Sequence, residues 1–354
     1  LEHYIYQPVN INNETKIITG NPWAASTSIN VDNNGKIISR DLLSFQQIDI
    51  NIKNNSNATF ENEVDLTFPY FHIINNSTAV FNKKLKIIDF GDDGSPIIEK
   101  DNGFSGGSLS LDNSTLDIKE AEFYETNALI NNGSTAKIDN LYGYGSKIYV
   151  VNDSKLEINK NAEFEGAHLT IKDDSNATIN GALSVIGSGT IKFVDGELAV
   201  NDDDGGINIA HSNLNVGGEV NFASSVAKLN NSSNVNFKDK LTLIDSAMLL
   251  KNSSTLNVGG VAEFGGSALI IKDDSNATIN GELTVRDYSN ILISKSNLNV
   301  EGEVNFNNSI AELNNSSNAT INGELTVENY SNIWIFKSNL NVAGEVNFKN
   351  SVAE

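Results

Sequence analysis

Residues 296–337 read SNLNVEGEVNFNNSIAELNNSSNATINGELTVENYSNIWIFK and contain two copies of one unit. Each copy opens on a serine followed by an asparagine, at Ser296 and at Ser317, which are 21 residues apart. The same spacing continues on both sides, and the serines in register are Ser212, Ser233, Ser254, Ser275, Ser296, Ser317 and Ser338. A fixed period of about 20 to 50 residues is typical of solenoids and related repeat arrays, so this repeat decides the fold.

Inside the unit, apolar residues alternate with polar ones. Counting the serine as position one, positions three and five are apolar, as in Leu298 and Val300, and position seven is usually glycine, as in Gly302. Positions nine and eleven and a later pair near positions sixteen to eighteen are apolar again. A period of two over four or five residues predicts short β-strands. Three strands per unit cannot fold alone but bury a common core when they stack. The sequence therefore predicts an all-β chain, a right-handed parallel β-helix of about 20–21-residue, three-strand coils.

Neighbouring coils differ in a regular way. Position eleven alternates between phenylalanine and a branched aliphatic residue, as in Phe306 and Val327, so the true unit is a double coil of 42 residues. We expect this alternation to let stacked layers interdigitate without a cavity. We expect Gly281 and Gly323, at position seven, to be required for backbone dihedrals. The asparagines at position two are expected to form turns and a ladder of side-chain hydrogen bonds.

The chain departs from the repeat in four places. Residues 1–34 break the pattern and are expected to cap a β-helix that spans residues 35–354. Irregular insertions are expected near residues 89–108 and 196–211, where the serine spacing rises to 37, enough for a full coil and a short one. The C-terminus stops mid-coil, which favours a fragment of a longer protein.

Charge and cysteine content narrow the partners. The chain has 24 basic and 45 acidic residues, a net charge of −21, and no cysteine. An acidic surface repels phosphate backbones and anionic lipid, so we expect no nucleic acid partner. No apolar stretch approaches the roughly 20 residues of a membrane-spanning helix. The lack of cysteine excludes a disulfide framework and thiolate metal sites.

The sequence favours a protein that is not an enzyme and has no cofactor. The acidic pairs before Ser175 and Ser275 recur with the repeat, whereas a catalytic site occurs once. One weak metal candidate is the run Asp202, Asp203 and Asp204, whose carboxylates could bind Ca²⁺; the alternative is a solvated acidic turn.

Two asparagines are candidates for glycosylation. Asn176 and Asn276 each lie in an Asn-x-Thr triplet with an aspartate two residues before the asparagine. This arrangement resembles the acceptor sites of bacterial oligosaccharyltransferases. The alternative is that the same repeat simply recurs at both places.

The coils resemble the passenger regions of monomeric autotransporter adhesins of Gram-negative bacteria, including the self-associating kind that forms biofilm aggregates. The resemblance lies in the roughly 20-residue coils with NSTL or SNLNV turns, the acidity and the missing cysteine, over residues 35–354. Filamentous haemagglutinin-like exoproteins are similar, and the lack of a recognisable two-partner secretion domain favours the autotransporter type. The resemblance implies export through an outer-membrane translocator barrel and a place at the bacterial surface or outside the cell, with roles in adhesion and virulence.

Two classes of function follow. The first is an adhesin that binds host-cell glycan, matrix protein or its own copies. The second is a β-helical protein that binds or cleaves polysaccharide, of the phage tailspike or lyase type.

A binding surface is predicted near the C-terminal end of the sequence. Tyr288 and Tyr330 are one double coil apart, and the strand alternation turns Trp334 outward, with Leu292 as its equivalent one double coil earlier. Exposed aromatic side chains on a polar rod are typical of glycan stacking or protein contact. The alternative is that further coils or a loop cover these residues.

Overall fold

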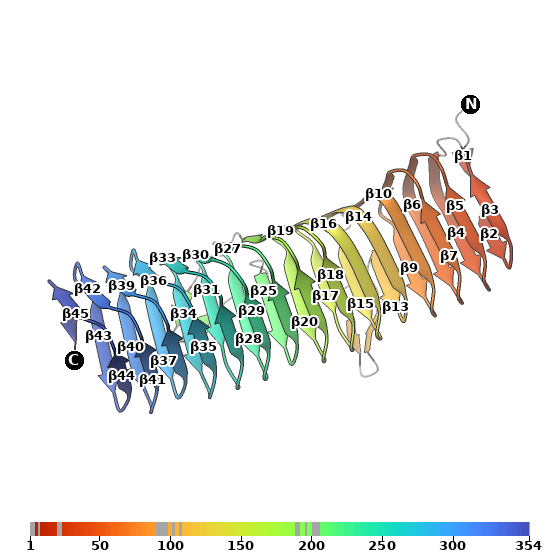
Figure 1. The fold of residues 1–354 in the computed structure, drawn as a ribbon. Coiled ribbons are helices and arrows are strands. Elements are labelled where there is room, and N and C mark those ends of the chain that lie inside the picture. Colours follow the sequence, from red (N-terminus) through yellow and green to blue (C-terminus); the bar gives the residue numbers. More distant parts are fainter. Residues whose placement is uncertain are drawn as a thin grey trace. The chain divides into compact units, whose positions relative to one another are not determined.

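The computed structural model describes residues 4–5, 8–19, 23–89, 98–100, 103–105, 108–187, 192–194, 197–199 and 206–353. Its regular structure in these ranges is β-strand without helix, and it confirms the right-handed parallel β-helix with coils of about 21 residues (Figure 1). The chain divides into two compact units, residues 1–178 and residues 179–354, which are described one at a time.

Unit 1 has three parallel sheets, one for each strand position of the coil. The first sheet holds β3 (Thr15–Ile18), β5 (Lys36–Ser39), β7 (Asn57–Phe60), β18 (Lys155–Ile158), β21 (Asn176–Ile179) and the first halves of β10 (Thr78–Ile88), β14 (Thr115–Tyr124) and β16 (Thr135–Tyr144). The second sheet holds β1 (Tyr4–Ile5), β8 (Val64–Thr67), β19 (Ala162–Glu165), the starts of β4 (Trp23–Asp32) and β6 (Leu43–Lys53), and the second halves of β10, β14 and β16. The third sheet holds β2 (Val9–Asn12), β9 (Tyr70–Ile74), β13 (Leu109–Asp112), β15 (Asn127–Asn131), β17 (Lys147–Val150), β20 (His168–Lys172) and the ends of β4 and β6.

Unit 2 repeats this arrangement with shorter, separate strands. Its first sheet holds β26 (Asn213–Val216), β29 (Asn234–Phe237), β32 (Thr255–Val258), β35 (Asn276–Ile279), β38 (Asn297–Val300), β41 (Asn318–Ile321) and β44 (Asn339–Val342). The second holds β22 (Leu183–Ile186), β27 (Val220–Ala223), β30 (Leu241–Ile244), β33 (Ala262–Gly265), β36 (Leu283–Arg286), β39 (Val304–Asn307), β42 (Leu325–Glu328) and β45 (Val346–Lys349). The third holds β25 (Gly206–Ala210), β28 (Val226–Asn230), β31 (Ala247–Leu250), β34 (Ala268–Lys272), β37 (Asn290–Ser294), β40 (Ile310–Asn314), β43 (Asn332–Phe336) and β46 (Val352–Ala353).

The two 37-residue gaps do not hold a full coil and a short one, so that expectation is wrong. Thr78 of β10 pairs directly with Thr115 of β14, and Leu183 of β22 pairs with Val220 of β27. Each gap is one coil with an insertion. The insertions contain antiparallel hairpins, β11 (Ile98–Lys100) with β12 (Gly103–Ser105) and β23 (Lys192–Val194) with β24 (Glu197–Ala199).

The parallel pairing begins inside the segment that the sequence assigns to the cap. Val9 of β2 pairs with Ile29 of β4, and Thr15 of β3 pairs with Lys36 of β5. Strands on both sides of residue 34 therefore belong to one stack. The role of residues 1–34 as a cap stays a prediction.

The core consists of the inward side chains of all three sheets. In unit 2 the predicted column of alternating ring and aliphatic side chains is buried, as Phe264, Val285, Phe306 and Val327 show. A cavity of about 20 Å³ lies among Phe306, Ala319 and their neighbours and reaches Leu340, whose side chain is half-exposed. Because this cavity is partly open at the last coils, close packing between the inner coils stays a prediction.

The serine repeat has a hydrogen-bonding cause. Many serine hydroxyls in the column accept a bond from the backbone N–H of the serine one coil earlier, for example Ser275 Oγ from Ser254 N at 3.1 Å, although the Oγ atoms of Ser56 and Ser212 have no partner. Ser254 and Ser275 are completely buried. A second column stands before the third sheet, where Ser267 Oγ accepts from Ser246 N at 3.1 Å. A buried turn amide without a partner is costly, so each coil needs a small hydroxyl at these two points.

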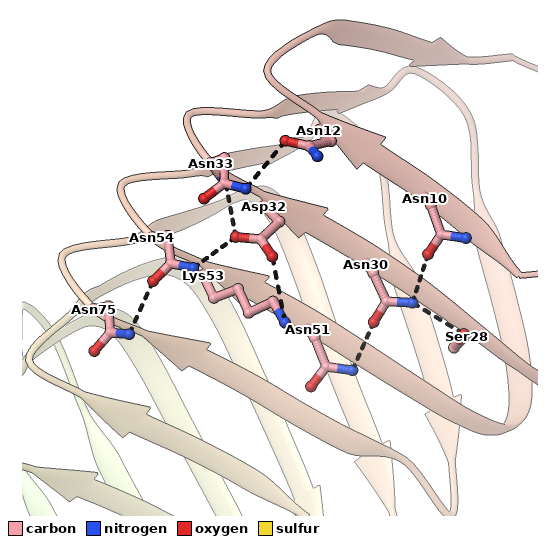
Figure 2. A network of polar contacts seen from close by, with 10 residues as sticks. All are labelled: Asn10, Asn12, Ser28, Asn30, Asp32, Asn33, Asn51, Lys53, Asn54 and Asn75. Carbon is pink, nitrogen blue, oxygen red and sulfur yellow. Dashed lines mark hydrogen bonds and ion pairs between the residues drawn. The ribbon is translucent and has the colours of Figure 1, made fainter.

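Asparagine side chains form the expected ladders on the outside. In unit 2, the Nδ2 of Asn297, Asn318 and Asn339 each donates to the Oδ1 of the asparagine one coil earlier, at 2.8–3.0 Å. Figure 2 shows similar ladders in unit 1, where Asn30 donates to Asn10 and Asn51 to Asn30, both at 3.0 Å. Position two itself is the first residue of a strand rather than a turn. The left-handed turn residues precede the serine, as in Asn54 and Asn55.

The position-seven glycines are explained by close stacking rather than by backbone dihedrals, contrary to expectation. Positive φ angles occur at Gly133, Gly145, Gly166, Gly206 and Gly266 but not at Gly281 or Gly323. A Cβ at Gly281 would lie 2.7 Å from the carbonyl carbon of Gly260 in the coil before. The column is therefore glycine because adjacent backbones touch there.

Candidate functional site

The residues of the predicted binding surface lie on two coils of unit 2 whose turns differ in length from those of the other coils. The turn from the second to the third sheet has one left-handed residue at Asp245, Gly266 and Asn308, but it has two in the coils of Tyr288 and Tyr330. Those same coils have a shorter turn after the third sheet, with Lys295 or Lys337 in place of an Asp-Asp or Asn-Ser pair. In these coils the turn before the third sheet is one residue longer and the turn after it is one residue shorter, so the period stays at 21.

Tyr288 and Tyr330 are the second left-handed residues of these longer turns. Both have φ of 64°, and their exposed fractions are 78% and 81%. Each is held by its backbone, because Tyr288 N donates to Asn308 O at 2.8 Å and Tyr330 N to Asn350 O at 2.9 Å. The left-handed conformation is unfavourable for a bulky side chain. The other two-residue left-handed turns in the described part of the chain carry asparagine, aspartate, serine or glycine at this place, as at Asn55, Asp274, Ser316 and Gly133. Both tyrosines therefore hold their rings in solvent at a conformational cost.

The third sheet adds Trp334 and Leu292 beside this corner. Ile333 is buried and Trp334 is 42% exposed, which places the indole on the outer face as the alternation predicts. Leu292 and Trp334 are both in register with Glu312, one coil away on either side. Leu292 is half-buried. Tyr288, Leu292, Tyr330 and Trp334, here called the aromatic patch, therefore lie at one corner of unit 2 on the two coils that flank the coil of Glu312.

Phe336, which was not predicted from the sequence, also belongs to this surface. Phe336 is 61% exposed, and its ring has the Lys337 Nζ 5.0 Å from its centroid. The strand alternation could have predicted its exposure, because Phe336 is two residues after Trp334 on the same strand and shares its outward direction. Together they put two large aromatic rings on the outer face of β43.

Charged groups surround the aromatic patch. Glu312 lies between Leu292 and Trp334, and its Oε1 accepts a bond from Asn314 Nδ2 at 2.9 Å. Arg286 and Asp287 form an ion pair just before Tyr288. Flat apolar rings within a polar border suit a ligand that has both apolar faces and hydrogen-bonding groups.

The candidate metal residues cannot be placed, because Asp202, Asp203 and Asp204 lie outside the described residues. Within the ranges that the structure describes, no group of three or more histidine, aspartate or glutamate side chains could hold a metal ion.

The two candidate glycosylation sites differ in accessibility. Asn276 is exposed, and its Oδ1 accepts the ladder bond from Asn297. Asn176 is half-buried at the start of β21, and its Nδ2 donates to Asp174 O at 3.4 Å. Modification of either residue stays a prediction, and a glycan on Asn276 would have to project beside its ladder.

The histidines that the structure describes have structural partners. His72 Nδ1 lies 2.6 Å from Ser110 Oγ on the neighbouring strand, and burial lowers the pKa of the imidazole. His168 and His211 each take part in a further interaction. Structural roles for these two side chains stay a prediction.

Among the described residues, no helix is long and apolar enough to cross a membrane. Relatives offer no help with the site. Comparison with protein-family models, with curated proteins and with solved structures finds no match to this chain. The function must therefore be argued from the surface chemistry of the chain itself.

Proposed function

We propose that this chain is a non-enzymatic adhesin passenger, carried at the bacterial surface or released from it after export through the outer membrane. Its aromatic patch binds host-cell glycan, matrix protein or another copy of the chain. The observation that carries the proposal is the pair Tyr288 and Tyr330, almost fully exposed in a left-handed conformation that favours asparagine.

Backbone strain that does not stabilise the fold points to a functional role for the strained residue, here Tyr288 and Tyr330. An asparagine would satisfy the same turn with less strain, and the backbone bonds that hold each turn do not need the ring. The rings therefore contribute nothing to the fold that a smaller polar residue would not. Retaining them is consistent with selection for what they contact.

The decisive test replaces Tyr288 and Tyr330 with asparagine and Trp334 with serine in one variant. We expect the two asparagines to raise the stability of unit 2 by about 1 kcal/mol each, because asparagine tolerates the left-handed region. We expect adhesion of displaying cells to host cells and to matrix-coated surfaces, or their mutual aggregation, to fall at least tenfold. A gain in stability with a loss of binding would separate function from folding.

Tyr70→Ser is the matched control, because Tyr70 is 48% exposed and belongs to unit 1, whereas the aromatic patch belongs to unit 2. Its adhesion and aggregation should equal those of the natural sequence. If the triple variant folds and still adheres and aggregates normally, the aromatic patch is not the binding surface. If only aggregation is lost, the ligand is a second copy of the chain.

A further inference from the structure

Unit 1 carries a second surface that breaks the repeat. On the outer face of its second sheet, strands β10, β14, β16 and β19 hold the side chains of Lys84, Lys86, Glu120, Glu122, Tyr124, Tyr142, Tyr144, Glu163 and Glu165, here called the tyrosine face. The equivalent outward positions of β36, β39 and β42 in unit 2 are mainly threonine and asparagine, such as Thr284, Asn305 and Thr326. The sheet needs only small polar residues there, so the tyrosines require another explanation.

Contacts within the tyrosine face hold its groups in fixed positions. Lys84 Nζ lies 2.6 Å from Glu122 Oε1 and 3.0 Å from Glu120 Oε1. Tyr142 Oη donates to Glu165 Oε2 at 3.1 Å. The geometry of these polar groups is therefore set before any ligand arrives.

Two of the aromatic rings contact each other across adjacent coils, and a third lies in register with them. The rings of Tyr124 and Tyr142 have centroids 5.8 Å apart with a tilt of 59°, and Lys86 Nζ lies 5.4 Å from the centroid of Tyr124. Tyr124 pairs with Tyr144, and Tyr144 pairs with Glu165 on the next strand. Tyr144 is 48% exposed, whereas Tyr124 and Tyr142 are half-buried. The tyrosine face thus presents the exposed ring of Tyr144, the half-buried rings of Tyr124 and Tyr142, and the Glu165 carboxylate on the next coil.

Protonation keeps the hydroxyl groups useful as donors. Burial and the neighbouring Glu165 raise the pKa of Tyr142 to about 12, and burial raises the pKa of Tyr124. A phenol of ordinary pKa, about 10, is already protonated at neutral pH, so these upward shifts leave both hydroxyl groups protonated. Tyr142 and Lys84 already donate to glutamates of the face, so the hydroxyl groups of Tyr124 and Tyr144 and the Lys86 ammonium are the donors that a ligand would meet, beside the carboxylate acceptors.

We propose that the tyrosine face binds a neutral oligosaccharide laid along the stack of coils. Pyranose rings have apolar C–H faces that pack on tyrosine and hydroxyl groups that bond to carboxylates, phenols and ammonium groups. Adjacent coils are about 4.8 Å apart, so successive side chains of one column meet successive parts of an extended sugar chain.

Charge decides between sugar classes. The tyrosine face has two lysines and four glutamates, a net charge of −2, within a chain of net charge −21. Lys84 is already engaged by two of the glutamates. A sulfated or uronate polymer would be repelled, whereas a neutral sugar meets no such penalty.

The test uses the full chain and a panel of immobilised neutral hexose and N-acetylhexosamine oligosaccharides, with heparin as the polyanionic comparison. We expect at least one neutral oligosaccharide to bind and heparin not to bind. The variant Tyr124→Ser/Tyr144→Ser should weaken that binding at least tenfold. The control Tyr70→Ser has the same exposed fraction as Tyr144 and should bind as the natural sequence does.

Two further measurements protect the result from misfolding and from the aromatic patch. Circular dichroism must show that the double variant keeps its β-structure, and bound sugar should slow chemical nitration of Tyr144 in the natural sequence. Bound sugar should leave the nitration of Tyr288 and Tyr330 unchanged, which separates this site from the proposed adhesin surface. The proposal fails if no neutral sugar binds, if heparin alone binds, or if a folded double variant binds normally.

Discussion

Replacing Gly302 by alanine tests why the glycine column exists. The added Cβ would lie 2.6 Å from the carbonyl carbon and oxygen of Gly281 and 2.8 Å from the nitrogen of Glu282. Favourable carbon contacts lie at about 3.5–4.0 Å, so the coils would have to separate by about 1 Å at this corner. Both neighbours are backbone atoms that cannot rotate away. We therefore expect Gly302→Ala to lower the free energy of unfolding by about 1–3 kcal/mol, as overpacking does.

The assay is thermal and urea unfolding followed by circular dichroism. For a unit of this size the loss corresponds to a fall in Tm of about 2–12 °C. Gly260→Ala should cost less, because its closest contact, to the carbonyl carbon of Asp239, is 2.9 Å.

A second pair of variants separates crowding from dihedral strain. Gly133 has φ of +72° and nothing within 4 Å of an added Cβ, so glycine is favoured there by the left-handed backbone conformation and not by crowding. Asparagine tolerates that conformation and should be nearly harmless at Gly133, but at Gly302 it should be at least as damaging as alanine. If asparagine instead restores stability at Gly302, the column is a matter of dihedrals and the stacking argument is wrong.

Three further predictions concern the interior. Ser77→Ala should lower the free energy of unfolding by about 1–3 kcal/mol, because Ser77 Oγ accepts the buried Ser56 N–H at 3.2 Å. Ser56→Ala should be nearly neutral, since Ser56 Oγ has no hydrogen-bond partner. Equal losses of stability for the two variants in urea unfolding would contradict this prediction. Burial lowers the pKa of His72, so the unfolded chain binds more protons, and stability should fall as pH drops below about 6.5 toward the lower folded pKa. His72→Asn should flatten that part of the pH profile in thermal unfolding, and an unchanged slope would assign it to other groups. Ala319→Val should fill part of the core cavity and raise stability by about 0.5–1 kcal/mol, and a loss in the same urea assay would show that the cavity cannot hold a γ-methyl group.

Much of the fold followed from the sequence because each coil repeats the same physical demands. The period of 21 and the alternation of apolar residues predicted the parallel β-helix, and Trp334 has the outward direction expected from Ile333. The prediction that failed concerned the two 37-residue gaps in the serine spacing. A spacing of 37 fits a full coil with a short one as well as it fits one coil with a hairpin insertion, and only the pairing of Thr78 with Thr115 distinguishes them.

The candidate surfaces were less predictable because they depend on neighbours in other coils. The reason for glycine at Gly281 was misjudged, since the clash involves a residue 21 positions away. The tyrosine face was missed for a similar reason. Tyr124, Tyr142 and Glu165 lie in coils where the serine spacing is 20 or 21, and they meet only when β14, β16 and β19 are aligned. Local patterns specify which way a side chain points, but not which partner it will find.

The turn residue that moves between corners has a genetic consequence. Because the longer corner at Tyr288 is compensated by the shorter one at Lys295 within the same coil, the register of the following coils is unchanged. Unequal recombination in steps of 42 residues would therefore add or remove whole tyrosine-bearing modules without disturbing the stack. Valency could then change by one ring per event while the affinity of each ring stayed the same, and the length of the gene would set the avidity of the protein.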